Sequence, residues 1–515
     1  MATRGLQLRL FFTCWLVFGA HHATDFVREH YLVLSIVEDG SFDLTKYVGL
    51  HVDIFRNPPT APHGGAHHGA NPGISMVAVP PYLVLKPLVD RIVAREQASR
   101  GPTDTLTVYR DETRARRLAF YEATRRMGLD VRFGLVALIT TLLCMAPLAA
   151  ASSVVMFRLF LGIGFGSAAA LGLALVYAFA TPVFFRASYL NQNLAIAVFS
   201  ITGFMLLWNP GNLLRLSAGT RQAIAGLMGG LSLLSDYSGG LTLVLLGGYL
   251  GLREWQERTP ASAARALLRY GLGAAGPVLM LWFYQWQSFG HPFLPPQHWM
   301  PPVDWIEIGY QGVGGPTLEL FGLLLFDLRF GLFVAAPIML LAVVSPFVLW
   351  RSRRVVPWRE IAFCFVLAIA YLVFFSAVQY TRLQWVTGIR YLLPAVPFLF
   401  IPIGLTLLRV PRLLSYSLVA VSFVAVWSMT MMRSQTGVLD AVMRTMLEGP
   451  RLPALTTFSR MSAQYAPWLT GDASPLPLFA LLGILLVAIW RMRAPLAPIA
   501  SSELVIRDRR ETPGA

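Results

Sequence analysis

The chain has 515 residues, of which 55% are hydrophobic and only 13% are charged. Soluble domains carry about 25% charged residues, so this composition excludes a disordered chain, a disulfide-rich secreted protein and an ordinary cytosolic protein. It predicts an all-α polytopic membrane protein. The net charge of +15 is interpreted as a topology signal rather than as a sign of nucleic-acid binding, because cytoplasmic loops of membrane proteins collect arginine.

Twelve apolar segments approach the length of about 20 residues that a helix needs to cross a bilayer. They lie near residues 6–20, 134–158, 163–181, 191–208, 222–236, 239–252, 270–287, 331–350, 361–378, 390–408, 414–431 and 475–490. The first segment has no clear cleavage site after it, so we expect a retained helix rather than a signal peptide. Residues 74–90 contain Pro80, Pro81 and Pro87 and are interpreted as an amphipathic or re-entrant piece at the outer interface.

The arginine-rich loops predict the orientation. They lie at 253–269, 351–359 and 409–412 and in the tail after residue 490, and we expect them in the cytoplasm together with both termini. All nine histidines then fall on the extracytoplasmic side, where we expect the functional site. This organisation gives a transmembrane catalytic module at 1–408 with a first outer loop at about 21–132, C-terminal transmembrane helices at 409–490 with an outer loop at 432–474, and a cytoplasmic tail at 491–515.

Local patterns predict several elements in the outer loops. Residues 24–37 have helical character, which would place Asp25 and Glu29 on one helix face, four residues apart. EDGS at 38–41 predicts a turn, and SFDLTKY at 41–47 predicts a short extended piece. LDAVMRTMLEG at 439–449 predicts an interfacial helix. The three cysteines (Cys14, Cys144 and Cys364) lie in apolar stretches and predict neither a disulfide framework nor a metal site.

Several stretches, taken together and in order, resemble one enzyme superfamily. They are YLVLSIVEDGSFDLTKY, ANPGISMVAVPPY, ALVYAFATPVFFRASYLNQN, GLMGGLSLLSDYSG, WFYQWQSFGHPF with FDLRFGLFVAAPIML, and GIRYLLPAVPFLF. Between about residues 6 and 408 the chain is similar to the GT-C membrane glycosyltransferases, which include protein O-mannosyltransferases and lipid A aminoarabinose transferases. The resemblance implies a GT-C-like fold with about twelve transmembrane helices and a large first extracytoplasmic loop containing interfacial helices. It also implies transfer of a sugar from a polyprenyl-phosphate donor, and it favours a bacterial inner membrane.

The chemistry of such a transfer requires a carboxylate to deprotonate an acceptor hydroxyl and cations to hold the phosphate leaving group. In the family the base is an acid in the first outer loop, and by position Asp25 is its match. The family often has adjacent acids there, whereas Phe26 follows Asp25, so Glu29 remains an alternative base and Asp53 a third candidate. Arginine forks onto phosphate oxygens, and Arg390 and then Arg329 are the expected phosphate ligands, because both lie at outer helix ends within the matched motifs.

Plainer interpretations remain open for the same residues. Asp25 and Glu29 would equally pair with Arg28 or His30 on a solvated helix face, and the two arginines would suit headgroup anchors at the interface. Asp236, an ionisable residue at a span end, is a secondary candidate.

The histidines His63, His67 and His68 suit either a flexible loop or a divalent metal such as Mg²⁺ or Mn²⁺, without a defined ligand spacing. The expected partners are the lipid-linked sugar donor, an acceptor that is a glycan, a lipid or a protein, and membrane lipids. The alternatives to an enzyme are a non-catalytic GT-C-like scaffold and, with less support, a transporter of lipids or solutes.

Overall fold

A computed structural model describes residues 2–100, 115–304, 307–350, 357–382, 388–432, 437–461 and 473–491. The arginine-rich segment 351–356 and the tail 492–515 lie outside these ranges, so the predictions made for them are not addressed. Within the described residues the chain is almost entirely helical, as the composition predicts. The only regular sheet there is an antiparallel pair of three-residue strands, β1 (Ile54–Arg56) and β2 (Ala66–His68).

The first half of the chain contains α1 (Ala2–Ala20), α2 (Arg28–Leu34), η1 (Ser35–Asp39), η2 (Thr45–Tyr47), α3 (Gly73–Ser99), α4 (Ala115–Arg126), α5 (Asp130–Thr140), η3 (Thr141–Met145), α6 (Ala146–Ile163), α7 (Ser167–Phe179), α8 (Val183–Arg186), α9 (Gln192–Trp208), η4 (Pro210–Asn212), α10 (Ala218–Ser235) and α11 (Gly239–Glu257). The second half contains α12 (Pro260–Phe289), η5 (Pro296–Trp299), α13 (Leu318–Phe326), α14 (Leu332–Ala335), η6 (Pro337–Leu340), α15 (Leu341–Trp350), α16 (Trp358–Ser376), η7 (Gln379–Arg382), η8 (Leu393–Ala395), α17 (Val396–Leu407), α18 (Arg412–Met431), α19 (Val438–Glu448), α20 (Pro453–Met461) and α21 (Leu476–Arg491). Each of the twelve apolar segments coincides with helical structure, and the expected helix at 439–449 is α19.

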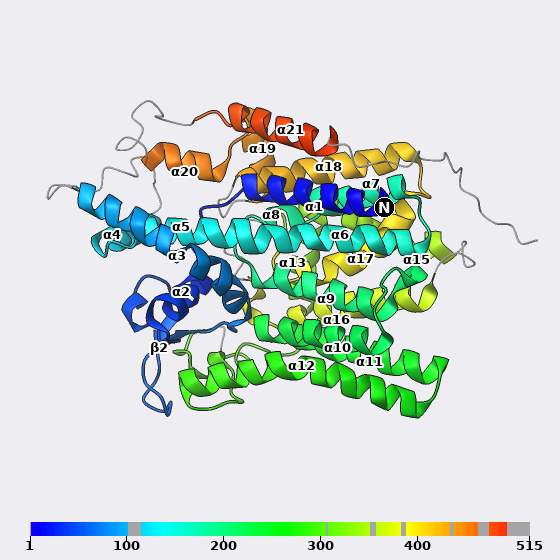
Figure 1. The fold of residues 1–515 in the computed structure, drawn as a ribbon, viewed down its shortest axis with the longest axis horizontal. Coiled ribbons are helices and arrows are strands. Elements are labelled where there is room, and N and C mark those ends of the chain that lie inside the picture. The colour runs from blue at the N-terminus through cyan, green and yellow to red at the C-terminus, as the bar shows by residue number, and fades with distance from the viewer. Residues whose placement is uncertain are drawn as a thin grey trace, which may run out of the picture.

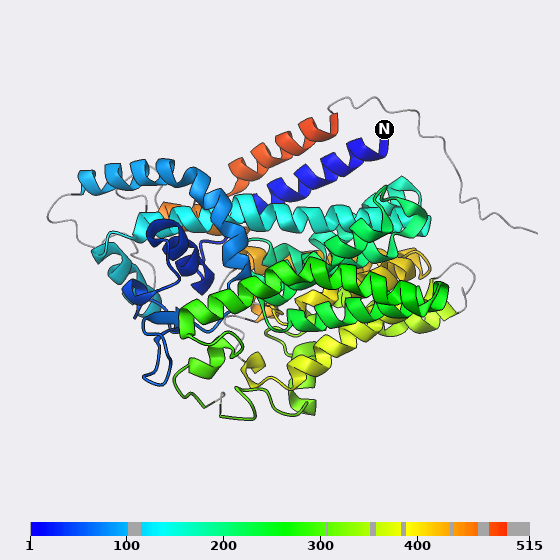
Figure 2. The same ribbon diagram turned by 60° about the horizontal axis from the view of Figure 1, so that its bottom comes forward.

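The long helices run side by side and form a bundle with two distinct ends (Figures 1 and 2). One end carries α2, α3, α4 and the β1–β2 hairpin, and we call it the hairpin end. The start of α1 and the turn between α11 and α12 lie at the opposite end, which we call the N-terminal end (Figure 1). All the sequence between α1 and α5 that the structure describes therefore gathers at one end of the bundle.

Four of the described helical segments are long and apolar enough to cross a membrane: Asp130–Ile163, Pro260–Phe289, Trp358–Ser376 and Arg412–Met431. Five shorter apolar helices accompany them. Helix α12 shows why a bilayer suits this surface. It exposes Leu268, Leu272 and Trp286 while it buries Tyr284 and Gln285, which is the reverse of the arrangement in a water-soluble helix.

Small residues bring the helices of the bundle into close contact. A Cβ atom on Gly226 of α10 would lie 1.9 Å from the carbonyl oxygen of Tyr270 in α12, and one on Gly273 of α12 would lie 1.9 Å from that of Ala223. Only glycine permits this approach, as is common where helices associate within membranes. The contact fixes α12, whose far end reaches the hairpin end.

The structure corrects two local predictions at the hairpin end. Helix α2 begins at Arg28, because the Val27 amide donates to Nδ1 of His30 at 2.9 Å and closes the first turn. Asp25 therefore lies outside the helix and does not share a face with Glu29. Residues 45–47 form a 3₁₀ turn rather than an extended piece, because Oδ1 of Asp43 accepts the Thr45 amide at 2.9 Å, as in an Asx turn.

Helix α3 continues through its three prolines and is not among the four candidate spans. An ion-pair network attaches it to its neighbours: Arg132 of α5 bonds Glu38 at 2.7 Å and Asp90 at 2.8 Å, and Lys86 bonds Asp90 at 2.6 Å. These pairs join α3, α5 and η1. They hold the segment between α1 and α5 against the bundle.

Candidate functional site

A cation placed between two carboxylates forms the centre of the candidate site. Arg28, the first residue of α2, contacts Oε1 of Glu29 with its Nε at 3.1 Å and Oδ2 of Asp53 with its Nη1 at 2.8 Å. The Glu29 side chain is 8% exposed, whereas that of Asp53 is 30% exposed, so only Asp53 is open to a second partner. The loop before β1 supplies Asp53 and brings it across 25 positions of sequence.

Arg390 joins this group from the other end of the chain. Its charge acts on Asp53, and its guanidinium lies 4.3 Å from the ring centre of Tyr391, to whose hydroxyl it also donates. The Tyr391 hydroxyl in turn approaches the carbonyl of Tyr380 at 3.3 Å. We call Arg28, Glu29, Asp53 and Arg390 the Arg28 cluster.

Asp236 lies on the border of the same region. The charges of Asp236, Arg28 and Arg390 all act on the hydroxyl of Tyr380. Burial, together with the negative charge of Asp236, raises the pKa of this hydroxyl. Asp236 ends α10, where its Oδ2 accepts from Gln192 at 2.8 Å and its Oδ1 accepts the Ser238 amide at 2.9 Å. Of the sequence-predicted residues, Glu29 and Asp53 both contact Arg28, the charge of Arg390 acts on Asp53, and the charge of Asp236 acts on the neighbouring Tyr380.

The electrostatics of the cluster keep its ion pairs charged. Burial acts to raise the pKa of Asp53, but the charge and the hydrogen bond of Arg28 outweigh it and hold this pKa below its ordinary value. Burial acts to lower the pKa of Arg28, and the carboxylates of Glu29 and Asp53 raise it instead. Asp53 is therefore a carboxylate, and Arg28 a guanidinium, at neutral pH.

Two histidines beside the cluster are neutral. Burial, reinforced by Arg28, lowers the pKa of His68 to about 3. Burial also lowers the pKa of His51, whose Nδ1 accepts the Asp53 amide at 3.1 Å. Among the described residues no group of three or more His, Cys, Asp or Glu side chains is arranged to hold a metal ion, so no chemical step is derived through one.

Asp25 and Arg329 each form an ion pair with a residue outside the Arg28 cluster. Asp25 pairs with Arg117 of α4, with 3.0 Å between Oδ1 and Nη2. Arg329 follows α13 and pairs with Asp327 at 3.0 Å, and its side chain is 65% exposed.

Asp25 instead borders an apolar pocket. The pocket has a volume of about 840 Å³, and Thr24 and Phe26, the neighbours of Asp25 in the chain, both contribute to its wall. The size and lining suit an aliphatic chain. Its apolar lining comes from α3, α4, α5, α20 and the segment before α2, and includes Phe26, Ile92, Phe120, Phe133, Leu138 and Phe458.

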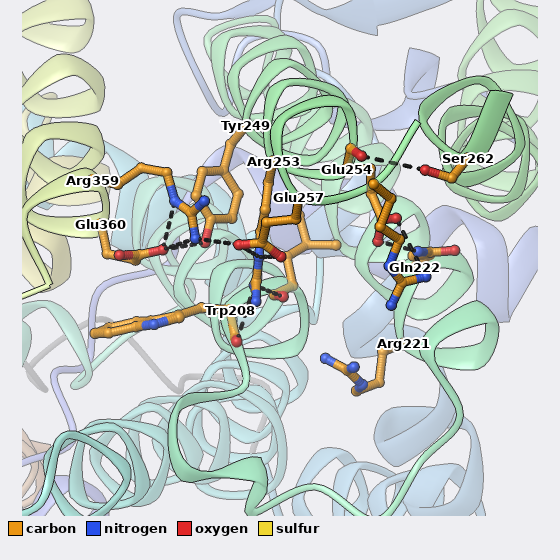
Figure 3. Close-up of polar contacts among 12 residues, drawn as sticks. Trp208, Arg221, Gln222, Tyr249, Arg253, Glu254, Glu257, Ser262, Arg359 and Glu360 are labelled. Carbon is orange, nitrogen blue, oxygen red and sulfur yellow. Dashed lines mark hydrogen bonds and ion pairs between the residues drawn. The ribbon is translucent and has the colours of Figure 1, made fainter. Parts of the chain in front are cut away.

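A second polar group lies at the N-terminal end, where ion pairs and hydrogen bonds join side chains from several helices (Figure 3). Arg359 of α16 contacts Glu360 at 2.9 Å and Glu257 of α11 at 2.8 Å. Arg253 contacts Glu257 at 3.2 Å and donates to the carbonyl of Leu207 at 2.7 Å, which caps the last turn of α9. These bonds tie α9, α11 and α16 together, so we assign this group a structural role.

Sequence reasoning did not select Arg28 or His68 for the roles that the structure suggests. From the sequence, Arg28 is expected only to pair with Asp25 or Glu29 on a solvated helix face. His68 is expected only in a flexible loop or as a metal ligand. The available signal for Arg28 was a cation directly beside a candidate base. For His68 no local signal exists, because its position depends on the pairing of two short strands.

Comparison with known proteins gives no further assignment, since no protein-family model, no curated protein sequence and no solved structure matches the chain.

Proposed function

We propose that the chain is a GT-C-type glycosyltransferase that moves a sugar from a polyprenyl-phosphate donor to a glycan, lipid or protein acceptor. The observation that carries this proposal is the Arg28 cluster, in which Arg28 contacts two carboxylates and the charge of Arg390 acts on Asp53, at one end of an apolar helical bundle. Arginines bind a lipid phosphate, a carboxylate accepts a proton, and the bundle supplies the membrane setting.

The geometry favours Asp53 as the base and Arg28 with Arg390 as the phosphate ligands. In the free protein Arg28 neutralises Asp53 and keeps it a weak base. When a donor phosphate attracts Arg28, Asp53 loses part of its counter-charge and its proton affinity rises. Asp53 then takes the proton of the acceptor hydroxyl as the acceptor oxygen bonds to the sugar C1, and the C1–O bond breaks with its electron pair leaving on the phosphate.

The apolar pocket supports a lipid-linked donor. Its wall includes Phe26, two residues before Arg28 in the chain, so a polyprenyl chain held there would pass the segment that leads into α2. Asp25 would then line the donor route. In this proposal about twelve helices span a bacterial inner membrane, with the hairpin end outside the cytoplasm.

A transfer assay tests the proposal. The full chain in nanodiscs receives radiolabelled polyprenyl-phosphate sugars and a membrane lipid extract as acceptor. Asp53→Asn is expected to lower transfer at least about 100-fold, as loss of a general base does. Asp39→Asn, which alters an exposed carboxylate of the same outer segment, serves as the matched control.

The remaining carboxylate variants separate the alternatives. Loss of transfer with Glu29→Gln or Asp25→Asn, but not with Asp53→Asn, would move the base to that residue. No transfer by the folded wild type from any donor would reject the enzyme and favour the non-catalytic scaffold.

A further inference from the structure

Two buried side chains, one at the end of β2 and one just after it, carry polar atoms that have no hydrogen-bond partner in the part of the chain that the structure describes. These atoms are Nε2 of His68, the last residue of β2, and Oδ1 of Asn71, three residues later. Both side chains are almost completely buried. A buried polar atom without a partner is costly, so each such atom in a native fold calls for an explanation.

His68 is fixed as a hydrogen-bond donor. Its Nδ1 accepts the amide of Ala70 at 3.1 Å, which places the ring proton of the neutral imidazole on Nε2. The low pKa of His68, about 3 as a result of burial and of Arg28, keeps the ring in this state at neutral pH.

Asn71 is fixed as an acceptor. Its Nδ2 donates to the carbonyl of Leu233, in the last turn of α10, at 2.9 Å, and this leaves Oδ1 free. Gln297 of η5 holds the segment between the two residues, because its Nε2 donates to the Gly69 carbonyl at 2.7 Å. A donor and an acceptor are thus preorganised on one short segment.

The register of the hairpin directs His68 toward the site. His68 lies opposite Ile54, which packs in the main core and follows Asp53, and the charges of Arg28 and Asp53 both act on the His68 ring. His67 points to the other face of the strand, where its ring centre lies 5.0 Å from that of Phe289.

We propose that His68 and Asn71 hydrogen-bond the sugar of the lipid-phosphate donor, with His68 donating to one sugar oxygen and Asn71 accepting from a sugar hydroxyl. The inference rests on the proposed function, since it places the sugar next to the phosphate held by Arg28 and Arg390. A hydroxyl group both donates and accepts, so a sugar matches this pair. An ionised phosphate offers only acceptors and leaves Asn71 without a partner.

Binding to two lipids tests the inference without the transfer reaction. The full chain in nanodiscs is titrated with undecaprenyl phosphate and with undecaprenyl phosphate carrying glucose, mannose, galactose or arabinose. His68→Leu and Asn71→Leu are each expected to weaken binding of the preferred sugar lipid about five- to tenfold, the loss expected for one hydrogen bond. Binding of undecaprenyl phosphate is expected to change by less than about twofold, because Arg28 and Arg390 remain.

Two further variants exclude a structural explanation. His68→Gln restores an amide donor close to the Nε2 position and is expected to recover most of the affinity for the sugar lipid. His67→Leu lies on the opposite face of β2 and is expected to leave the difference in affinity between the sugar lipid and undecaprenyl phosphate unchanged. Equal losses for both lipids, or no loss for either, would overturn the inference. A third outcome separates this inference from the proposed function. If the wild type binds the sugar lipid but transfers no sugar, and the variants lose binding of the sugar lipid alone, sugar recognition is supported and the enzyme is rejected.

Discussion

Replacing Arg28 by methionine tests the central electrostatic argument. Two unit charges 4 Å apart interact by about 4 kcal/mol at an effective dielectric constant of about 20. Arg28 and Asp53 are in direct contact at 2.8 Å, but their side chains are 22% and 30% exposed, and water screens part of this attraction. We therefore expect the pKa of Asp53 to rise by about one to two units in Arg28→Met.

The direction of the effect follows from the proposed role of Asp53. Activity requires the carboxylate, so it is present above the pKa of Asp53 and is lost as the pH falls through it. In the wild type this loss lies below the ordinary aspartate value of about 3.9. Without Arg28, burial is no longer outweighed to the same extent, and the acid limb of kcat/KM moves upward by about one to two pH units.

The assay is the pH dependence of sugar transfer, with Arg28→Lys as the matched control that keeps the positive charge. The plateau value of kcat/KM is expected to fall in Arg28→Met, because a phosphate ligand is lost. The pH at which the acid limb falls does not depend on that plateau value. The same pair contributes to stability above the ordinary pKa of Asp53, and this contribution is lost as the pH falls through the folded-state pKa. Identical acid limbs in the wild type, Arg28→Met and Arg28→Lys would refute the coupling.

Two further predictions concern the framework of the bundle. Arg359→Met leaves the carboxylate of Glu360, which is 5% exposed, without its main counter-charge, and is expected to destabilise the protein by about 1–3 kcal/mol in denaturant unfolding. Arg258→Met, which removes a side chain that is 61% exposed, should cost less than about 0.5 kcal/mol, and equal costs would argue against the structural role of this group. A membrane-impermeant maleimide is expected to label Val52→Cys, at the hairpin end, in intact cells, and Gln256→Cys only after permeabilisation, with little background because the three native cysteines are buried. The opposite pattern would reverse the proposed orientation.

The helical architecture was predictable because it depends on local properties. A segment of about 20 apolar residues must satisfy its backbone hydrogen bonds internally, and a helix does so without reference to distant sequence. This explains why the predicted segments, from 6–20 in α1 to 475–490 in α21, all coincide with helices. The chemical types at the site were also accessible, since Glu29, Asp53 and Arg390 were selected as carboxylates and a cation at expected positions.

Local reasoning gave wrong results where a single side-chain contact decides the backbone. The spacing of Asp25 and Glu29 predicted one helix face, but the bond from Val27 to His30 starts α2 at Arg28. The extended conformation predicted for SFDLTKY is replaced in the same way by a 3₁₀ turn, which the side chain of Asp43 stabilises. Such contacts change an element boundary by a few residues, which is enough to turn a carboxylate toward a different partner.

By itself, then, the sequence determined a bundle of apolar helices and the residues suited to acid–base and phosphate chemistry. Only the tertiary structure decided which of them meet. Arg28 bridges Glu29 and Asp53 across a loop, the charge of Arg390 acts on Asp53 from more than 330 positions away, and Asp25 pairs with Arg117. The physical reason is that ion pairs and strand register depend on distances in space, which helix packing sets and which no local pattern of residues encodes.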